Sequence, residues 1–468
     1  MAEELFADAR QLLSAGDDAS GASVGTRQRL KQAQELLLGL GYLSRSAEDA
    51  PLRPSSRDPA IHQNRLALLS LASAFKRVFR LGARRAPGAV FFGGEIAPES
   101  VGLATSGAEP IAVGGRGATV RQAFEGCIGE AAERLSCLAW GDERAFESRA
   151  SDLEQALKPR RAGDLAWLLA GIGLDADAGG RAVSWLKARS LDESHEIAVP
   201  AALCLRYPEA ARERTSPRAD SSGCASGPSL VDAKLRALLE LVERDAIALW
   251  WYGGRPPAAL DRGVQEGPEP RRLLSSLRRG IARRTWFLDI TTDLELPVVA
   301  ALSCDDDGSA VTLGFAADLD PVEAARAAAL ELCQMELAQD IVCLKLEQEG
   351  PDALNEQDRR TLDRRKRLHL EAWPQLLPQR ERKDLGRSDS LATGAALQNC
   401  IDALHRQGLE AYWLDLSRPR IGIPSVRVIV PGLQSEKPDW ETERLRRSAA
   451  QSNRSIKIKR WADLPPLV

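Results

Sequence analysis

The chain has 468 residues, of which 44% are hydrophobic and 28% charged, and its formal net charge is −3. This composition indicates a globular protein with a sizeable core, and the slight negative charge argues against a nucleic-acid partner. No apolar run approaches the roughly 18 residues that a membrane span needs, and the acidic amino terminus lacks a signal-peptide pattern. The eight cysteines are scattered without a Cys-x-x-Cys pair. We therefore expect a cytoplasmic protein without disulfides, zinc or membrane contact.

The first 85 residues predict a helical amino-terminal extension. Helical spacing recurs over residues 5–13, 27–40 and 61–80, interrupted by polar stretches at 16–25 and 44–59. The stretch 21–25 matches the Gly-x-Ser-x-Gly pattern of a nucleophile elbow, but no strand precedes it, so we interpret it as a flexible loop. A buried-strand pattern near residue 86 then begins the main body, which we assign to residues 86–468. Residues 150–195 are expected to be rich in helix, and 200–206 to form a strand.

The most informative stretch runs from Ser221 to Trp250. It opens with a loop of small residues up to Gly227, in which backbone N–H groups can approach a ligand. A helix follows, on which Asp232, Glu240 and Glu243 share one face. One interpretation is a solvated face balanced by arginines at 236 and 244. The other is a row of carboxylates that binds a hard cation such as Mg²⁺.

The repetition of this pattern favours the second interpretation. Glu130 and Glu133, Glu240 and Glu243, and Glu331 and Gln334 each follow the same loop, helix start and alanine at one fixed distance. Repeated segments usually form repeated structural units. If the three helices converge, their carboxylates share a cavity, which is tolerable only when cations bind there. A nucleotide with more than one Mg²⁺ is the simplest occupant, and residues 114–117 would form a second phosphate-facing loop.

A second repeat supports this organisation. Residues 286–301 and 412–429 both show a strand that ends in Asp-x-Ser/Thr, a turn, and a strand that starts at proline. Asp305-Asp-Asp-Gly308 is expected to be a hairpin turn rather than a calcium loop. Helices are predicted over 321–346, 352–369, where the charge indicates a surface helix, and 391–407. No Walker P-loop occurs in the chain, so a nucleotide would need another mode of binding.

The motifs resemble those of the YcaO superfamily over roughly residues 90–435. They are Gly129-Glu-Ala-Ala-Glu-Arg134, Ser222-Gly-Cys-Ala-Ser-Gly227 with the helix after it, and Gly422-Ile-Pro-Ser-Val-Arg-Val-Ile-Val-Pro-Gly432. The resemblance implies an α/β fold with internal strand–helix repeats around a central nucleotide site, here behind the helical extension. Its members bind ATP and Mg²⁺ and phosphorylate a peptide backbone amide oxygen.

The resemblance also implies roles for individual residues. Glu130, Glu133, Glu240 and Glu243 would be the catalytic core, and together with Asp232 they would bind metal. Contacts to the nucleotide would come from Arg134, Ser222, Gly227, Asp232, Arg244, Gln334 and Arg427. Three positions depart from the usual pattern: Asp232 stands where the family usually has Glu, Pro228 replaces an Asn, and Ser-Ser-Gly replaces Ser-Asn-Gly.

The function implied by the resemblance is an ATP-dependent cyclodehydratase that forms azoline heterocycles, the precursors of thiazoles and oxazoles, in a ribosomally made peptide. Two alternatives stay open: a thioamide-forming enzyme with a TfuA-type partner, and a catalytically silent scaffold that docks a leader peptide. The four glutamates disfavour the scaffold. The expected partners are the precursor peptide and a separate leader-binding protein, either like a ubiquitin-activating enzyme or of TfuA type. A homodimer is compatible with the resemblance.

The carboxy terminus, Leu464-Pro-Pro-Leu-Val468, carries a further expectation. Cyclodehydratases of this family place a proline-rich ending in the active site, and proline lowers the entropy that docking loses. The alternative is a frayed terminus. If the ending docks, its deletion should reduce cyclisation far more than ATP binding.

Overall fold

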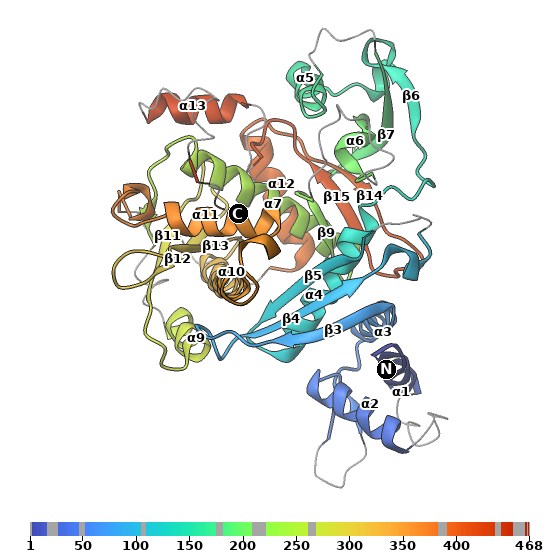
Figure 1. The fold of residues 1–468 in the computed structure, drawn as a ribbon. Helices are drawn as coiled ribbons and strands as arrows, with labels where there is room; N and C mark the ends of the chain where they lie inside the picture. The colour runs from blue at the N-terminus through green and yellow to red at the C-terminus, as the bar shows by residue number, and fades with distance from the viewer. Residues whose placement is uncertain are drawn as a thin grey trace.

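The computed structural model describes residues 2–15, 27–45, 52–103, 109–174, 181–207, 221–260, 268–381, 391–435, 441–452, 464, 465 and 467. It has a mixed α/β architecture, in which three larger sheets surround the helices α4, α7 and α10 (Figure 1). The helices α1, α2 and α3 lie together at one end of the molecule. The expected α/β fold with strand–helix repeats is confirmed.

Each larger sheet leads directly into one of these three helices. In the first sheet, β3 (Phe75–Leu81), β4 (Val90–Ile96) and β5 (Ile111–Gly117) are antiparallel neighbours, and α4 (Val120–Ser136) follows β5. In the second sheet, β10 (Ala258–Ala259), β11 (Arg284–Asp289), β12 (Val298–Cys304) and β13 (Thr312–Ala317) lie in this order, and α10 (Pro321–Glu349) follows β13.

The third sheet contains strands from distant parts of the chain. Its order is β6 (Phe146–Arg149), β7 (Ala182–Ser190), β14 (Tyr412–Asp415), β15 (Ser425–Ile429) and β9 (Cys224–Ser226), with β8 (Glu196–Pro200) also paired to β7. The helix α7 (Leu230–Trp251) follows β9. The expected hairpins are present as β11–β12 and β14–β15, and in both the aspartate that ends the first strand accepts a backbone N–H two residues later, at 2.9 Å.

The three helices begin with equivalent N-caps. The side chains of Thr119, Ser229 and Asp320 each accept a backbone N–H from the first turn. In each of the pairs Glu130/Glu133, Glu240/Glu243 and Glu331/Gln334, the first residue lies 11 positions and the second 14 positions beyond the N-cap of its helix. At about 1.5 Å per residue, each pair lies at the same depth along its helix, about 16 to 21 Å from the cap.

Two glycines allow the strands to pack closely on these helices. A Cβ atom at Gly115 of β5 would lie 2.0 Å from the carbonyl oxygen of Ala123 in α4. A Cβ atom at Gly314 of β13 would lie 2.2 Å from the backbone nitrogen of Leu332 in α10. Any side chain at either position would force the helix away from its sheet, so both glycines determine where the acidic residues lie.

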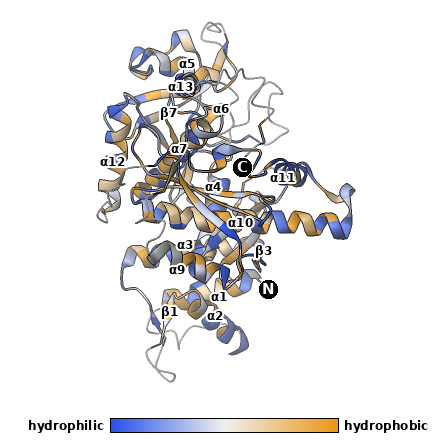
Figure 2. Ribbon diagram, turned by 90° about the vertical axis from the view of Figure 1, so that its left-hand side faces the viewer, coloured by the Kyte–Doolittle hydropathy of each residue, from blue (hydrophilic) through white to orange (hydrophobic). Residues whose placement is uncertain are grey.

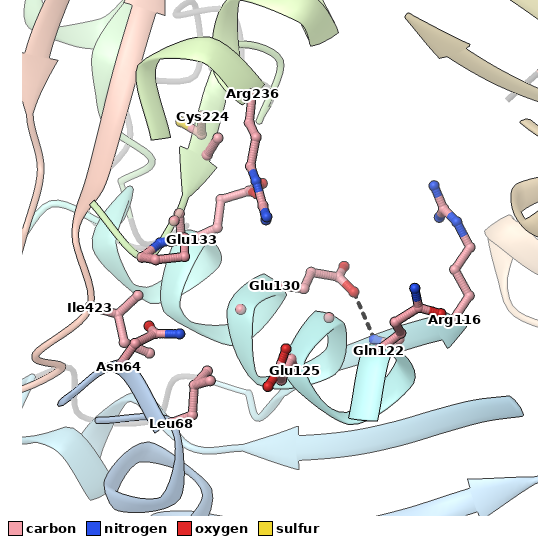
Figure 3. A pocket seen from close by; sticks show the side chains of 18 of the residues that line it. Asn64, Leu68, Arg116, Gln122, Glu125, Glu130, Glu133, Cys224, Arg236 and Ile423 are labelled. Carbon is pink, nitrogen blue, oxygen red and sulfur yellow. Dashed lines mark hydrogen bonds between the residues drawn. The ribbon is translucent and has the colours of Figure 1, made fainter. Parts of the chain in front are cut away.

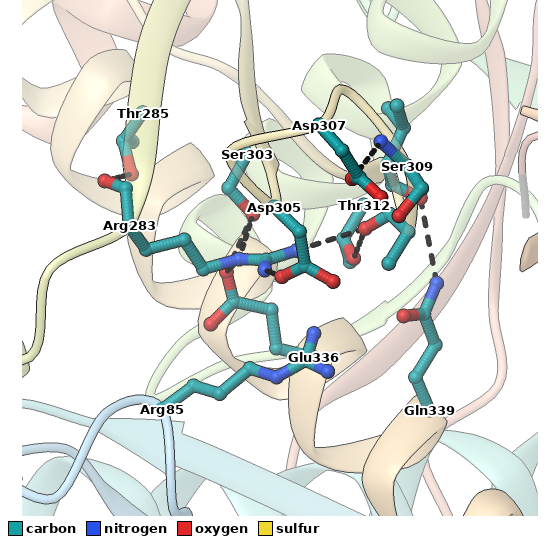
Figure 4. Close-up of polar contacts among 12 residues, drawn as sticks. Arg85, Arg283, Thr285, Ser303, Asp305, Asp307, Ser309, Thr312, Glu336 and Gln339 are labelled. Carbon is teal, nitrogen blue, oxygen red and sulfur yellow. Dashed lines mark hydrogen bonds and ion pairs between the residues drawn. The ribbon is translucent and has the colours of Figure 1, made fainter. Parts of the chain in front are cut away.

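A buried ion-pair network fixes α10 (Figure 4). The carboxylate of Glu336 is 1% exposed and accepts hydrogen bonds from Arg278 at 2.8 Å and Arg283 at 3.0 Å. It also accepts one from the Ser303 hydroxyl, and Arg283 pairs with Asp305 in the β12–β13 turn. Removing one partner of such a network leaves a buried charge uncompensated. The network therefore holds the helix that presents Glu331 and Gln334 to the site.

The amino-terminal helices share a core with the main body. They are α1 (Ala2–Ala15), α2 (Arg27–Gly39) and α3 (Pro59–Ser73), with a short β1–β2 pair (Leu43–Ser44 and Arg53–Pro54) between α2 and α3. Phe6 of α1 stacks on Phe124 of α4, with ring centroids 5.7 Å apart. The predicted boundary at residue 85 falls inside the β3–β4 hairpin, so the part that is helical ends at α3.

Three local predictions were wrong. The helical pattern expected over 61–80 ends at Ser73, and the aromatic and β-branched residues after it form β3. In the described part of 150–195, which leaves out 175–180, helix is limited to α5 (Ala162–Ala170) and short 3₁₀ turns, and β7 follows at Ala182–Ser190. The strand expected at 200–206 is β8, which ends at Pro200 and is followed by α6 (Ala201–Cys204). The Gly-x-Ser-x-Gly stretch at 21–25 lies outside the described residues.

The remaining helices cover the outside. They are α9 (Pro268–Arg278), α11 (Glu356–Arg367), α12 (Thr393–Arg406) and α13 (Glu443–Gln451). Figure 2 shows α11 as predominantly hydrophilic, which confirms the charged surface helix. The Asp305–Gly308 turn between β12 and β13 is also confirmed. Within the described part of the chain, every helix is too short or too polar to cross a membrane.

The last residues are packed against the largest core. Leu467 is 3% exposed, and its carbonyl oxygen accepts a hydrogen bond from Arg364 of α11 at 2.7 Å. The Trp251 indole donates to the carbonyl oxygen of Pro465 at 3.0 Å. These contacts exclude a frayed end for the described tail residues. They place Pro465 at the end of α7, where Trp251 lies eight residues beyond Glu243.

Candidate nucleotide and metal site

A cavity of about 510 Å³ lies between α4, α7 and the strands β5 and β9 (Figure 3). It brings together residues that are more than a hundred positions apart in the sequence. Its lining includes Gly114, Gly115, Arg116, Gln122, Glu125, Glu130, Glu133, Cys224, Gly227, Arg236 and Glu240. Three of the four predicted catalytic glutamates therefore face one space.

The first acidic pair comes from α4. Glu130 accepts the backbone N–H of Gly114 at 2.7 Å and forms an ion pair with Arg134 at 2.9 Å. Burial raises the pKa of Glu133 well above its usual range, and the negative charge of Glu240 raises it further. Glu133 thus lies where a negative charge is costly unless a cation is near.

The second pair comes from α7. Glu240 accepts the backbone N–H of Gly223 at 3.2 Å. The Arg244 guanidinium lies 3.6 Å from both Glu240 and Glu243, and it partly compensates their charge. Burial raises the pKa of Glu243 to about 8; Arg244 opposes this shift, whereas the charges of Glu331 and Glu240 add to it. Glu243 is therefore coupled to both neighbouring acids.

The third helix reaches the same cluster through Arg116. This arginine of β5 donates to the side-chain oxygen of Gln334 at 2.7 Å and lies 3.3 Å from the carboxylate of Glu331. A Cβ atom at Gly114 would be 3.2 Å from the Gln334 amide nitrogen and 4.0 Å from Glu130, so the missing side chain leaves room for both. Acidic groups from α4, α7 and α10 thus converge as the repeat predicted.

Glu331, Arg116 and Arg236 were not among the predicted site residues. The signal for Glu331 was present, because it occupies the first acidic position of the third repeat. Arg116 lies in the Gly-Gly-Arg-Gly stretch that was interpreted as a loop. Arg236 lies one turn before Glu240 and lines the cavity, where it can meet anionic ligand groups.

The two predicted phosphate-facing loops are wrong in their local structure. Gly114–Gly117 is the end of strand β5, and the residues before α7 form a turn followed by β9. Their backbone donors are used internally: Gly114 donates to Glu130, Gly223 to Glu240, and Gly227 to Pro424 at 3.0 Å. Positive charge for an anionic ligand must therefore come from arginine side chains rather than from these N–H groups.

Other predicted site residues lie beside the cavity. Asp232 accepts the Ser229 hydroxyl at 2.6 Å within the helix cap, next to Gly227. Arg427 of β15 is buried and donates to the sulfur of Cys224 at 3.2 Å, directly behind the cavity wall. Ser222 and Gly223 are the central residues of the turn that presents the Gly223 N–H to Glu240. The metal and nucleotide roles of these three residues stay predictions.

The carboxylate oxygens of this acidic cluster are the kind of ligand atom that Mg²⁺ prefers. Glu130, Glu133 and Glu240 line the cavity, while Glu331 pairs with Arg116 of the lining and Glu243 pairs with Arg244. Burial raises the pKa of Glu133 and of Glu243, and hard cations prefer such oxygen ligands. As the side chains stand, no three acidic, histidine or cysteine groups within the described residues are close enough to hold one ion. Glu130, Glu240, Glu243 and Glu331 instead face arginines at 2.9–3.6 Å. Metal binding would therefore exchange these arginine contacts for the cation.

Comparison with known proteins decides the family. Residues 114–434 match the model of the YcaO cyclodehydratases, which is described as ATP- and Mg²⁺-binding. The chain belongs to the YcaO family. The expected cofactors, ATP and Mg²⁺, are thus confirmed as the ligands of this family.

Individual similar proteins show how much of the chain and of each relative the similarity covers. An uncharacterised protein of Methanothermobacter thermautotrophicus is 28% identical over 345 residues, which cover 71% of this chain and 85% of the relative. A heterocyclase solved with substrate and cofactor is 26% identical with a TM-score of 0.61, over 77% of this chain and 50% of that one. The chain thus spans half of that heterocyclase. YcaO from Methanopyrus kandleri, bound with AMPPCP and Mg²⁺, has a TM-score of 0.56 at 19% identity, over 78% of this chain and 88% of that one, which supports the fold alone.

Proposed function

We propose that this YcaO protein is an ATP-dependent cyclodehydratase that forms azoline rings in a ribosomally made peptide. The observation that carries the proposal is the convergence of acidic groups from three helices: Glu130, Glu133 and Glu240 line one cavity together with Arg116 and Arg236, and Glu243 and Glu331 lie next to this group. A cluster of mutually repelling acids next to cationic side chains suits a bound metal–phosphate group. Membership of the family and the likeness to a heterocyclase support the same activity.

The acidic and basic side chains of the cavity suit the activation of a backbone amide by ATP. A backbone amide is a poor electrophile, and its oxygen leaves only after activation. Bound ATP with Mg²⁺ would supply the phosphoryl group that turns this oxygen into a leaving group. The five glutamates would hold the cations, while Arg116 and Arg236 would meet the negative charge that accumulates at the transferred group. The attacking nucleophile is a Cys, Ser or Thr side chain of the peptide, so the enzyme need not provide one.

The substrate is expected to arrive with a second protein. The amino-terminal helices pack on α4 through the Phe6–Phe124 contact and share its core, so they form part of the catalytic body. We propose that a separate leader-binding protein delivers the precursor peptide. A partner like a ubiquitin-activating enzyme would accompany ring formation, and a TfuA-type partner would accompany thioamide formation.

Mass spectrometry of the reaction tests the proposal. The protein is incubated with ATP, Mg²⁺, a Cys-, Ser- or Thr-rich candidate peptide and a candidate leader-binding protein, both to be sought among the neighbouring genes. We expect the loss of one water and the release of one phosphate for each modified residue. Exchange of oxygen for sulfur that requires added sulfide would replace ring formation by thioamide formation. Full modification with the Glu243→Gln variant would leave only a scaffold role.

A further inference from the structure

The outermost strand of the first sheet has an open edge. The order β3-β4-β5 leaves β3 with one strand partner (Figure 1). No backbone hydrogen bond joins the outer edge of residues 76–81 to another described segment. Such an edge offers a row of unpaired N–H and C=O groups, which can pair with an additional strand.

The side chains along this edge are basic and exposed. Lys76, Arg77, Phe79 and Arg80 are all exposed, and Phe79 retains 38% of its surface. Arg77 pairs with Glu95 on β4 and lies 5.3 Å over the Phe79 ring. Within the described part of the chain, neither Lys76 nor Arg80 forms an ion pair. The edge therefore has positive charge available for an incoming partner.

The positive charge along β3 determines which kind of partner can pair with its edge. A second copy of β3 would place cations directly opposite cations, which is destabilising in a paired strand. An extended segment with acidic side chains would instead gain both ladder hydrogen bonds and favourable charge contacts. We propose that the edge of β3 binds an acidic peptide segment as an added strand, and that this holds a peptide substrate beside the cavity. The role in holding a peptide substrate rests on the function proposed above.

The sheet register connects this edge to the site. Phe79 lies opposite Gly93 of β4, and Gly93 lies opposite Gly114 of β5, where Glu130 and Gln334 meet. The ring of Phe79 covers Gly93, where a Cβ atom would be 2.7 Å away. Neighbouring strands are about 4.8 Å apart, so an added strand would lie about 14 Å from β5. Because an extended residue spans about 3.3 Å, roughly five residues must separate the bound segment from the residue that is modified.

Binding is tested directly with a defined probe. The probe is a fluorescein-labelled peptide of about ten residues in which Glu and Val alternate, so that it can form a strand with one acidic face. Fluorescence anisotropy compares the full-length wild type with the Lys76→Glu/Arg80→Glu variant. The matched control is Arg27→Glu/Lys31→Glu, which reverses two exposed cations on α2. Further probes replace Glu by Lys, replace alternate Val by Pro, or use single-stranded DNA.

We expect the β3 variant to bind the acidic peptide about tenfold or more weakly, with the control unchanged. The Lys and Pro probes should bind poorly, and hydrogen exchange should show new protection at residues 76–81. Equal binding by both variants, protection elsewhere, or preferential binding of DNA would overturn the proposal. ATP turnover distinguishes the proposed β3 binding site from the proposed enzymatic function. A β3 variant with normal ATP turnover but weak peptide binding supports both proposals. A wild-type protein that binds the probe but does not turn over ATP contradicts the proposed function and leaves the binding site standing.

Discussion

Replacing Glu243 by Gln should stabilise the protein at alkaline pH while it abolishes ATP turnover. Burial raises the pKa of this carboxyl from 4.5 to about 8, so the folded protein holds the proton more tightly than the unfolded chain does. Stability is therefore lost as the pH rises from about 4.5 to about 8, and the full penalty applies above that range. At about 1.4 kcal/mol per pH unit, the upper limit of this penalty is about 5 kcal/mol.

The observed gain should be smaller, about 1–3 kcal/mol, because Arg244 can move toward the carboxylate and water can enter the cavity. Thermal melts of wild type, Glu243→Gln and the exposed control Glu347→Gln, at pH 5.5 and pH 8.5, measure it. The gain of Glu243→Gln over wild type should be larger at the higher pH. Mg²⁺ with ATP should stabilise the wild type and have little effect on this variant. A variant that is less stable than wild type at both pH values, or that keeps full ATPase activity, would refute this reasoning.

The remaining predictions follow from single contacts. Glu130→Gln should also abolish ATP turnover with the fold intact, as ATPase assays and melts of the same sample would show. Arg116→Ala should weaken ATP binding about tenfold or more in calorimetry, whereas Arg121→Ala on the outer side of α4 should leave it unchanged. Gly115→Ala should cost about 2 kcal/mol or more because its Cβ would collide with Ala123, whereas Gly163→Ala, with open space around it, should not. Deleting residues 464–468 should lower the free energy of unfolding by about 2–4 kcal/mol because it removes the contacts of Pro465 and Leu467. The deletion should also reduce cyclisation more than nucleotide affinity. A truncated protein with wild-type stability and product yield would contradict both effects.

The convergence of the three acidic helices could be predicted from the sequence because its signal was repeated. The spacing between cap and acidic pair is a helical property, and it is the same for Thr119, Ser229 and Asp320. Three copies at one depth implied that Glu130, Glu240 and Glu331 could converge. The hairpins could also be predicted from the sequence, since aspartates 289 and 415 end their strands with the same turn.

Other features depended on contacts that no local pattern encodes. The glycines at 114 and 223 resembled a phosphate-binding loop, but their N–H groups donate to Glu130 and Glu240. Only the folded chain brings Arg116 to Glu331, which is 215 residues away. β3 was missed because Val78 and Leu81 also fit helical spacing, and its pairing with β4 decided the outcome. Tertiary contacts thus changed the local structure around the site while its acidic composition stayed as predicted.

Isotope transfer from the peptide to phosphate tests directly whether this protein activates a peptide backbone oxygen by phosphorylation. The peptide substrate is prepared with ¹⁸O in the carbonyl of the residue before the reacting Cys, Ser or Thr, and the reaction runs with ATP, Mg²⁺ and the partner protein in ordinary water. We expect each ring formed to release one phosphate that carries the ¹⁸O. Phosphate that contains only ¹⁶O, with the label lost to water or kept in the peptide, would contradict it.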